Sequence, residues 1–241
     1  MRIMNEVTAL VFAAGLGTRL YPLTANRPKA LVRYQQKTLL QHVLDKLVAA
    51  GIPRIVVNVH HFPDQIMDFL KAHPVEAEVL VSDERAYLRD TAGGLKFAEP
   101  LLGNAQHILM YNVDVLSSLN LEDMLTAHLQ SGAMATLAVR NRQTARYLAF
   151  DKRTMRLCGW QNVTTGESIG VVEDKLVNHL AFSGIHIVER DFFKYIPSVE
   201  KQSLTPLYVQ LSTEIPIMGY QHQNDEWMDV GKYEEFRNVL S

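Results

Sequence analysis

Short apolar runs alternate with helical patterns over the first 130 residues, and this alternation restricts the fold more than any other feature. The apolar runs cover residues 7–13, 55–59, 79–81 and 108–113. A helical pattern follows each run. The four patterns cover residues 38–51, a segment that starts at Pro63, a segment that ends near Gly103, and residues 121–129. The first of these helices begins with capping-box spacing at Thr38. Such a repeated β-α order predicts a mostly parallel sheet with right-handed crossovers.

The second half has a different pattern, with short strands predicted at residues 136–139, 147–150, 155–161 and 182–188, and a helix from Tyr233. Residues 152–154 look like a hairpin connection, and no Pro/Gly/Ser linker separates the two halves. We therefore expect one α/β domain over residues 1–241. It would be a Rossmann-like mixed, mostly parallel sheet with helices on both faces and extra strands added at the edge by the C-terminal half.

Composition excludes several classes of function. The chain has 241 residues, with 24 Lys and Arg against 26 Asp and Glu, so it lacks the basic excess of a nucleic-acid-binding protein. Its one cysteine, Cys158, is predicted to pack within a strand. A single cysteine permits no intrachain disulfide, which fits a reducing compartment. No signal-peptide pattern and no run of 18 apolar residues occurs, so we expect a cytoplasmic protein without a membrane partner.

A glycine-rich loop, Ala13-Ala14-Gly15-Leu16-Gly17-Thr18-Arg19, directly follows the first apolar run. Two glycines let backbone N–H groups approach a phosphate, and loops at the carboxyl ends of parallel strands form the ligand crevice. Arg19 and, after Arg27-Pro28, Lys29 add the charge that a triphosphate needs. The loop lacks the Gly-Lys-Ser/Thr ending of a P-loop and the third glycine of a dinucleotide fingerprint. A plain tight turn with exposed basic residues is the alternative interpretation.

The run from residue 10 to residue 32, LVFAAGLGTRLYPLTANRPKALV, resembles the signature of sugar-1-phosphate nucleotidyltransferases, also called nucleotide-diphosphate-sugar pyrophosphorylases. The resemblance extends over nearly the whole chain. Ser82-Asp83-Glu84, followed by Thr91-Ala92-Gly93-Gly94, looks most like the N-acetylmuramate-1-phosphate uridylyltransferases and the heptose- and mannose-1-phosphate guanylyltransferases.

This resemblance implies an enzyme of nucleotide-sugar biosynthesis for the cell envelope. It would transfer a nucleotidyl group from UTP or GTP to a sugar 1-phosphate with Mg²⁺ as cofactor, and release pyrophosphate. Residues 1–130 would form the nucleotide-binding half of the domain and residues 131–241 the sugar-phosphate-binding half.

The resemblance also implies roles for individual residues in nucleotide binding. Arg19 would bind the β- and γ-phosphates and Lys29 the α-phosphate, as the catalytic pair. The backbone of the loop would line the base and phosphates at Ala13, Ala14, Gly15, Gly17 and Thr18. Gly93 and Gly94 match the segment that meets the base and ribose, although Ala92 stands where relatives often have another glycine. Alternatively, these two glycines only allow a helix to pack tightly on the sheet.

Two carboxylates are the predicted metal ligands. Asp114 follows an apolar strand of fixed direction, which delivers it to the same crevice as the glycine loop. Asp229, in Glu226-Trp227-Met228-Asp229-Val230-Gly231, resembles the second metal aspartate of the family. Two hard carboxylates beside nucleotide phosphates suit Mg²⁺. The alternative for a single aspartate at a strand end is a turn or a helix cap.

The sugar-phosphate contacts rest on weaker patterns. Asn112 precedes Asp114, and Ser183-Gly184 opens the segment FSGIHIV, which resembles the family's sugar-contacting strand. We expect Asn112, Ser183 and Gly184 to bind the sugar phosphate. Whether Asn58, His60 or Lys175 also does so stays open, as do the base, the sugar and the state of any homo-oligomer.

Two other functions remain open from the sequence. One is an enzyme of the same fold whose acceptor is a phosphorylated alcohol or a molybdopterin. The other is a nucleotide-sugar sensor that binds without turnover, although a sensor would not need all four of Arg19, Lys29, Asp114 and Asp229.

Overall fold

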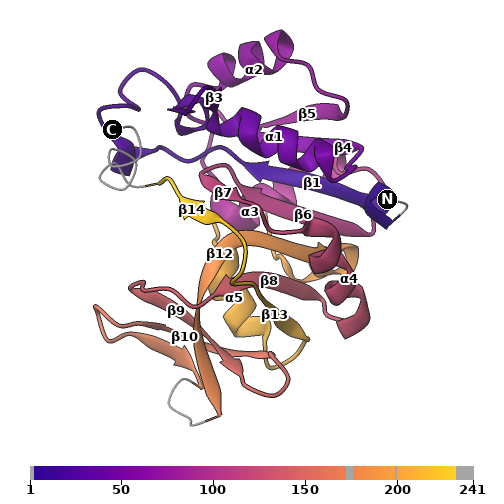
Figure 1. Cartoon of the computed structure of the whole chain (residues 1–241), viewed down its shortest axis with the longest axis vertical. Coiled ribbons are helices and arrows are strands. Elements are labelled where there is room, and N and C mark those ends of the chain that lie inside the picture. Colours follow the sequence, from indigo (N-terminus) through magenta and orange to yellow (C-terminus); the bar gives the residue numbers. More distant parts are fainter. Residues whose placement is uncertain (1–2, 172–175, 199, 232–241) are drawn as a thin grey trace.

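A ten-stranded mixed sheet runs through the chain in a computed structural model that describes residues 3–171, 176–198 and 200–231 (Figure 1). Its strands are β1 (Val7–Phe12), β4 (Arg54–Val59), β5 (Glu78–Asp83), β6 (His107–Asn112), β8 (Ala135–Arg140), β9 (Arg146–Asp151), β10 (Leu157–Asn162), β11 (Ser168–Gly170), β12 (Val177–Glu189) and β13 (Ile217–Gln221). The first four are parallel, in the order β6-β1-β4-β5, as predicted from the alternation of strands and helices. Their carboxyl ends therefore share one edge.

Helices cover both faces of this sheet, which confirms the expected layers. The buried residues of α1 (Leu39–Ala49), α2 (Pro63–Ala72) and α4 (Leu121–Ser131) join one apolar cluster, and those of α3 (Asp90–Ala98) and α5 (Leu204–Leu211) join another. Strand β1 lies between them, because Ala9 and Val11 face the first cluster and Leu10 the second. The capping prediction is also confirmed, since Thr38 Oγ1 accepts a hydrogen bond of 3.1 Å from the Gln41 N–H.

The C-terminal half adds antiparallel strands at the β6 edge of the parallel core. β12 pairs with β6, and β9 and β8 both pair with β12, so the sheet continues from one half into the other (Figure 1). The sequence did not predict α5 or the two small sheets, which are β2 (Arg33–Tyr34) with β3 (Lys37–Thr38), and β7 (Val115–Ser117) with β14 (Trp227–Asp229). The helix expected from Tyr233 lies outside the described residues.

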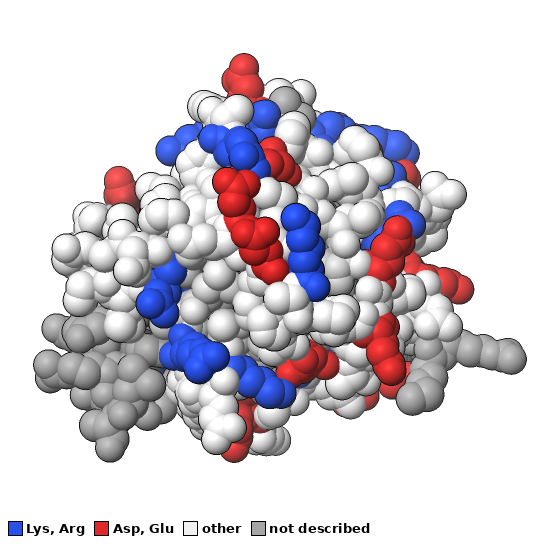
Figure 2. Space-filling view, turned by 90° about the horizontal axis from the view of Figure 1, so that it is seen from above, with Lys and Arg blue, Asp and Glu red and all other residues white. Residues whose placement is uncertain are grey.

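Charged side chains of both signs are interspersed on the face drawn in Figure 2. None of the helices in the described part of the chain has the length and hydropathy needed to cross a membrane.

His186 of β12 is enclosed in the second apolar cluster and makes stability depend on pH. Its Nδ1 lies 2.9 Å from the Tyr208 hydroxyl, and its ring stacks edge-on against Phe182. Burial lowers the pKa of His186 to about 3, against about 6.5 in the unfolded chain. The unfolded state therefore binds more protons between these values, and the free energy of unfolding falls as the pH falls from 6.5.

We expect His186→Gln to flatten this dependence by up to about 1.4 kcal/mol per pH unit between pH 6 and pH 4. Urea unfolding of wild type and variant over that range measures it. Exposed His73→Gln serves as the control and should leave the slope unchanged. Parallel curves for wild type and His186→Gln would contradict the assignment.

Candidate active site

A cleft of about 350 Å³ opens at the shared carboxyl edge of the parallel strands. Its walls come from the segment after β1, the ends of β4 and β5, the start of α3 and the turn after β6. The lining residues are Phe12, Ala13, Ala14, Gly15, Lys29, Asn58, Glu84, Leu88, Asp90, Thr91, Val113, Asp114 and Lys201. The glycine loop, Lys29 and Asp114 thus meet in one place, as parallel strand direction predicted.

The start of the glycine loop is held by Asn58 at the end of β4. Asn58 Oδ1 accepts hydrogen bonds from the backbone N–H groups of Ala13 (2.7 Å) and Ala14 (3.2 Å), while its Nδ2 donates to Glu84 Oε1 (2.9 Å). All of these groups are buried, so each bond compensates a desolvated polar group. Asn58 therefore positions the loop, a role that the sequence alone did not reveal.

We expect Asn58→Ala to lower the free energy of unfolding by about 1–3 kcal/mol, because two buried N–H groups and the Glu84 carboxyl lose their partner. The loop would also lose its fixed approach to a ligand, so nucleotide affinity should fall. Urea unfolding and nucleotide titration measure the two effects. Exposed Asn104→Ala is the matched control. Wild-type stability in Asn58→Ala would show that the loop is held by other contacts.

Further along the loop, Gly17 has a left-handed backbone (φ 67°) that suits glycine, and its carbonyl accepts a hydrogen bond from the Thr24 hydroxyl. A Cβ at Gly17 would lie 2.9 Å from Thr24 Cγ2 and 3.1 Å from Lys29 Cβ. Thr18 and Arg19 follow in an exposed 3₁₀ turn outside the cleft lining. Lys29 begins a second 3₁₀ turn, directly after Pro28.

Lys29, Asp114 and Asp229 converge beside the cleft. Lys29 Nζ forms an ion pair with Asp114 Oδ2, and both side chains are mostly buried. Asp229 is brought here by the pairing of β14 with β7. Next to this pairing, the Val230 N–H donates a hydrogen bond of 2.9 Å to the Asp114 carbonyl. The two predicted metal ligands, 115 positions apart in sequence (229 − 114), thus reach one site.

The electrostatics of this pair follow from burial. Burial raises the pKa of Asp229, and the nearby negative charge of Asp114 raises it further, while Lys29 and Arg19 act in the opposite direction. Gly231 gives the carboxylates room, because a Cβ there would lie 2.6 Å from Asp229 Oδ1 and 2.8 Å from Asp114 Oδ2. Two converging carboxylates, each with hard oxygen donors, fit a divalent cation such as Mg²⁺.

Gly93 and Gly94 lie inside α3, and a side chain at either position would meet protein atoms. A Cβ at Gly93 would lie 2.0 Å from the Glu200 carbonyl oxygen, and one at Gly94 would lie 2.8 Å from Glu84 Oε1. The absence of side chains therefore lets α3 approach its neighbours closely, which is the packing alternative for these glycines. Asp90 and Thr91, at the start of the same helix, line the cleft instead.

Among the residues expected to meet the sugar phosphate, Ser183 is engaged within the protein. Ser183 is buried, and its hydroxyl lies 2.7 Å from His222 Nε2, while His222 Nδ1 lies 2.7 Å from Asp225 Oδ1. Because an ionised carboxylate only accepts, His222 donates to Asp225 and accepts from Ser183. Gly184 has φ 79°, and a Cβ there would lie 3.1 Å from Asn112 Nδ2.

The structure also places the residues that were left open. His60 Nδ1 lies 2.8 Å from the Glu84 carbonyl, so it supports the wall of the cleft, and Lys175 lies outside the described residues. Glu84 is buried next to Asn58, and burial raises the pKa of its carboxyl.

Cys158 packs in β10, where its thiol donates to the Ala149 carbonyl at 3.2 Å. Lys201 lines the cleft without any prior signal in the sequence.

Comparisons with known proteins agree with this geometry. The model of a family described as nucleotidyl transferase matches residues 8–151. The chain is 34% identical over 242 residues to N-acetylmuramate alpha-1-phosphate uridylyltransferase of Caulobacter vibrioides, covering 92% of this chain and 91% of that protein. It is 32% identical over 134 residues to mannose-1-phosphate guanylyltransferase 1 of Arabidopsis thaliana, covering 54% and 37%.

Among solved structures, HddC from Yersinia pseudotuberculosis complexed with GMP-PN matches with a TM-score of 0.75 and 19% identity. The match covers 96% of this chain and 97% of that one. At that identity the likeness shows the fold alone.

Proposed function

The chain belongs to the nucleotidyl transferase family, and from this premise we propose that it transfers a nucleotidyl group from UTP or GTP to a sugar 1-phosphate and releases pyrophosphate. The observation that carries the proposal is the convergence of Lys29, Asp114 and Asp229 beside a cleft that the glycine loop lines. Residues 1–130 would bind the nucleotide and residues 131–241 the sugar phosphate.

The residues of the cleft suit this chemistry without a protein nucleophile. An oxygen of the sugar 1-phosphate is already anionic at neutral pH and can attack the α-phosphorus in line. The protein then has to hold the reactants and stabilise charge. We assign contact with the α-phosphate to Lys29 and contact with the β- and γ-phosphates to Arg19. The backbone of Ala13, Ala14 and Gly15 would face the nucleotide.

Asp114 and Asp229 are the residues that would hold Mg²⁺. When bound there, the ion would supply Lewis-acid polarisation of phosphate oxygens. When no ion is bound, the ion pair of Lys29 with Asp114 neutralises part of the negative charge of the two aspartates. We infer that Lys29 leaves this pair to contact phosphate when the nucleotide arrives.

A second cavity, of about 390 Å³, supports an acidic sugar as the acceptor. Residues of one short segment line both spaces, because Lys201 lines the cleft and Ser203 lines the cavity. Arg142 and Arg146 both line it, and no acidic residue is among the lining residues of the described chain. A guanidinium binds a carboxylate through paired hydrogen bonds. N-acetylmuramate 1-phosphate carries such a carboxylate and N-acetylglucosamine 1-phosphate does not.

The test is a matrix of four nucleoside triphosphates against several sugar 1-phosphates with Mg²⁺, read as pyrophosphate release. We expect release only when a triphosphate and a sugar phosphate are both present, with UTP or GTP preferred and N-acetylmuramate 1-phosphate the best acceptor.

Arg146→Ala should raise KM for N-acetylmuramate 1-phosphate and leave KM for N-acetylglucosamine 1-phosphate unchanged. Triphosphate binding without release across the matrix would favour a sensor. Release only with a non-sugar phosphate would move the acceptor to another class.

A further inference from the structure

Two histidines and a glutamate from three separate elements meet at one end of the sheet. His107 opens β6, His128 lies in α4, and Glu189 ends β12 directly opposite His107 in the antiparallel ladder. Glu189 Oε1 lies 3.1 Å from His107 Nδ1 and 2.9 Å from His128 Nε2. One potential ligand atom from each residue lies within 4.8 Å of those of the other two.

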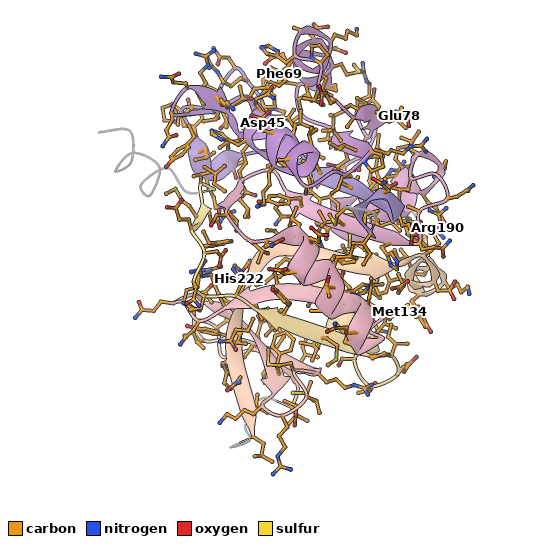
Figure 3. All side chains as sticks on the ribbon, turned by 45° about the vertical axis from the view of Figure 1, so that its right-hand side comes forward. Asp45, Phe69, Glu78, Met134, Arg190 and His222 are labelled. Carbon is orange, nitrogen blue, oxygen red and sulfur yellow. The ribbon has the colours of Figure 1, made fainter. Side chains whose placement is uncertain are left out.

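This cluster is remote from the cleft. β6 begins at His107 and runs toward Asp114, so the two ends of the strand are roughly 17 Å apart at about 3.3 Å per residue. Figure 3 shows Arg190, the residue after Glu189, on one side of the molecule and His222, which belongs to the network around Ser183, on the other. The residues assigned to nucleotidyl transfer therefore do not share this cluster.

We propose that His107, His128 and Glu189 form a binding site for a divalent first-row transition-metal ion, of which Zn²⁺ is the best match. Two imidazole nitrogens and one carboxylate oxygen are a donor set that proteins use for Zn²⁺, commonly with water as the fourth ligand. With bonds of about 2.0–2.1 Å, ligand atoms of a tetrahedral site are roughly 3.3 Å apart. The separations from Glu189 Oε1 need only a small outward movement to reach that value.

The surroundings of His128 suit a metal ligand. Its side chain is fully buried, and its Nδ1 lies 2.8 Å from the Thr136 hydroxyl. Without a metal, Nε2–H donates to Glu189 and Nδ1 can accept from the Thr136 hydroxyl. With a metal bound, Nδ1–H would donate to Thr136 instead and Nε2 would ligate the ion, in the way that outer partners orient metal-binding histidines.

Access to the site comes through the other two residues. The His107 side chain is 12% exposed and that of Glu189 is 30% exposed, so the cluster is in contact with solvent on this side. Without an ion, the ring N–H groups of both histidines can donate to the same carboxylate, so protons and the metal compete for one set of atoms. The guanidinium of Arg190 lies over the Phe193 ring, with 5.4 Å to its centroid.

A bound ion would join the start of β6, α4 and the end of β12. These elements come from both halves of the chain, so the site would stabilise the folded state as any ligand specific to that state does. The readout is therefore binding and thermal stability, and it is independent of nucleotidyl transfer.

The full chain, freed of metal with a chelator and kept in excess Mg²⁺, is titrated with Zn²⁺ by calorimetry and with Co²⁺ by visible absorption. We expect one equivalent to bind, a tetrahedral Co²⁺ spectrum, and a rise in Tm with Zn²⁺. His107→Ala and Glu189→Gln, which change partly exposed side chains, should each weaken binding about tenfold or more. Exposed His73→Ala and the cleft variant Asp114→Asn should bind as wild type does.

Several results would overturn the proposal. They are the absence of saturable Zn²⁺ binding, equal affinity in wild type, His107→Ala and Glu189→Gln, or loss of binding in Asp114→Asn. The last result would place the ion in the cleft instead.

Discussion

Replacing Lys29 with alanine is expected to lower the turnover of nucleotidyl transfer by roughly 30- to 1,000-fold, which corresponds to about 2–4 kcal/mol of barrier. The reason is that the Lys29 side chain, only 12% exposed, lies beside the cleft and can meet a phosphate away from bulk water. A charge-assisted contact in such a place contributes more than one on an open surface. Steady-state pyrophosphate release at saturating substrates measures the effect.

The same substitution should have the opposite effect on metal affinity in the absence of nucleotide. Lys29 is the cation that Asp114 contacts, so its removal leaves Asp114 and Asp229 with less compensation of their negative charge. We therefore expect Lys29→Ala to bind Mg²⁺ more tightly than wild type when no nucleotide is present. Calorimetry on the two proteins measures this.

Lys71→Ala is the control for both measurements, because the Lys71 side chain is 79% exposed and forms an ion pair with Asp68 on the surface of α2. It should match wild type in turnover and in Mg²⁺ affinity. If Lys29→Ala turns over at the wild-type rate, Lys29 is not in the mechanism. If turnover falls but Mg²⁺ affinity falls as well, the ion pair with Asp114 supports the metal site instead of competing with it.

The sequence predicted the parallel half of the fold because its evidence there is local. Each apolar run is short, two of the following helices have start signals, at Thr38 and Pro63, and Thr38 caps α1 as its spacing indicates. Strand direction then places whatever follows a strand at a known edge. For this reason Asp114 and the glycine loop could be predicted to share a crevice before any contact was known.

Features that depend on contacts between distant residues could not be predicted in the same way. Asn58 looked like a candidate ligand group, but it holds the backbone of Ala13 and Ala14, some 45 positions away. Ser183 matched a sugar-contacting motif, yet its hydroxyl is engaged by His222. The residue types are the same whether such a side chain faces a ligand or a neighbouring strand, so only the three-dimensional arrangement distinguishes them.

Gly93 and Gly94 illustrate a related limit. A glycine pair near the start of a helix fits close approach to a ligand and close approach to protein equally well. The carbonyl oxygen of Glu200 lies where a Gly93 side chain would begin, and Glu200 belongs to a segment more than 100 positions later. No pattern within the glycine-rich segment itself carries that information.

Asp114→Asn is expected to raise the Mg²⁺ concentration for half-maximal activity about tenfold or more and to lower the maximum rate, and Asp229→Asn should do the same more weakly. The tenfold figure is a lower expectation, because even residues that only support a metal ligand commonly change affinity 10- to 100-fold. Asparagine keeps the size of the side chain but removes a full charge from a site built on two carboxylates.

The difference between the two variants follows from how each carboxylate is engaged. Asp229 Oδ1 already accepts a hydrogen bond of 2.8 Å from the Gly231 N–H, and burial together with the charge of Asp114 raises the pKa of Asp229. Asp114 lines the cleft, and its charge becomes available to an ion once Lys29 leaves it to contact phosphate, as inferred above.

Metal titrations of pyrophosphate release, after removal of metal with a chelator, compare the two variants with wild type. Asp123→Asn, an exposed carboxylate at the start of α4, is the control and should leave the titration curve unchanged. A larger shift for Asp229→Asn than for Asp114→Asn would reverse their assigned importance. Wild-type Mg²⁺ dependence in Asp114→Asn would mean that the metal binds elsewhere, because a site that loses half of its protein charge cannot hold a hard divalent ion unchanged.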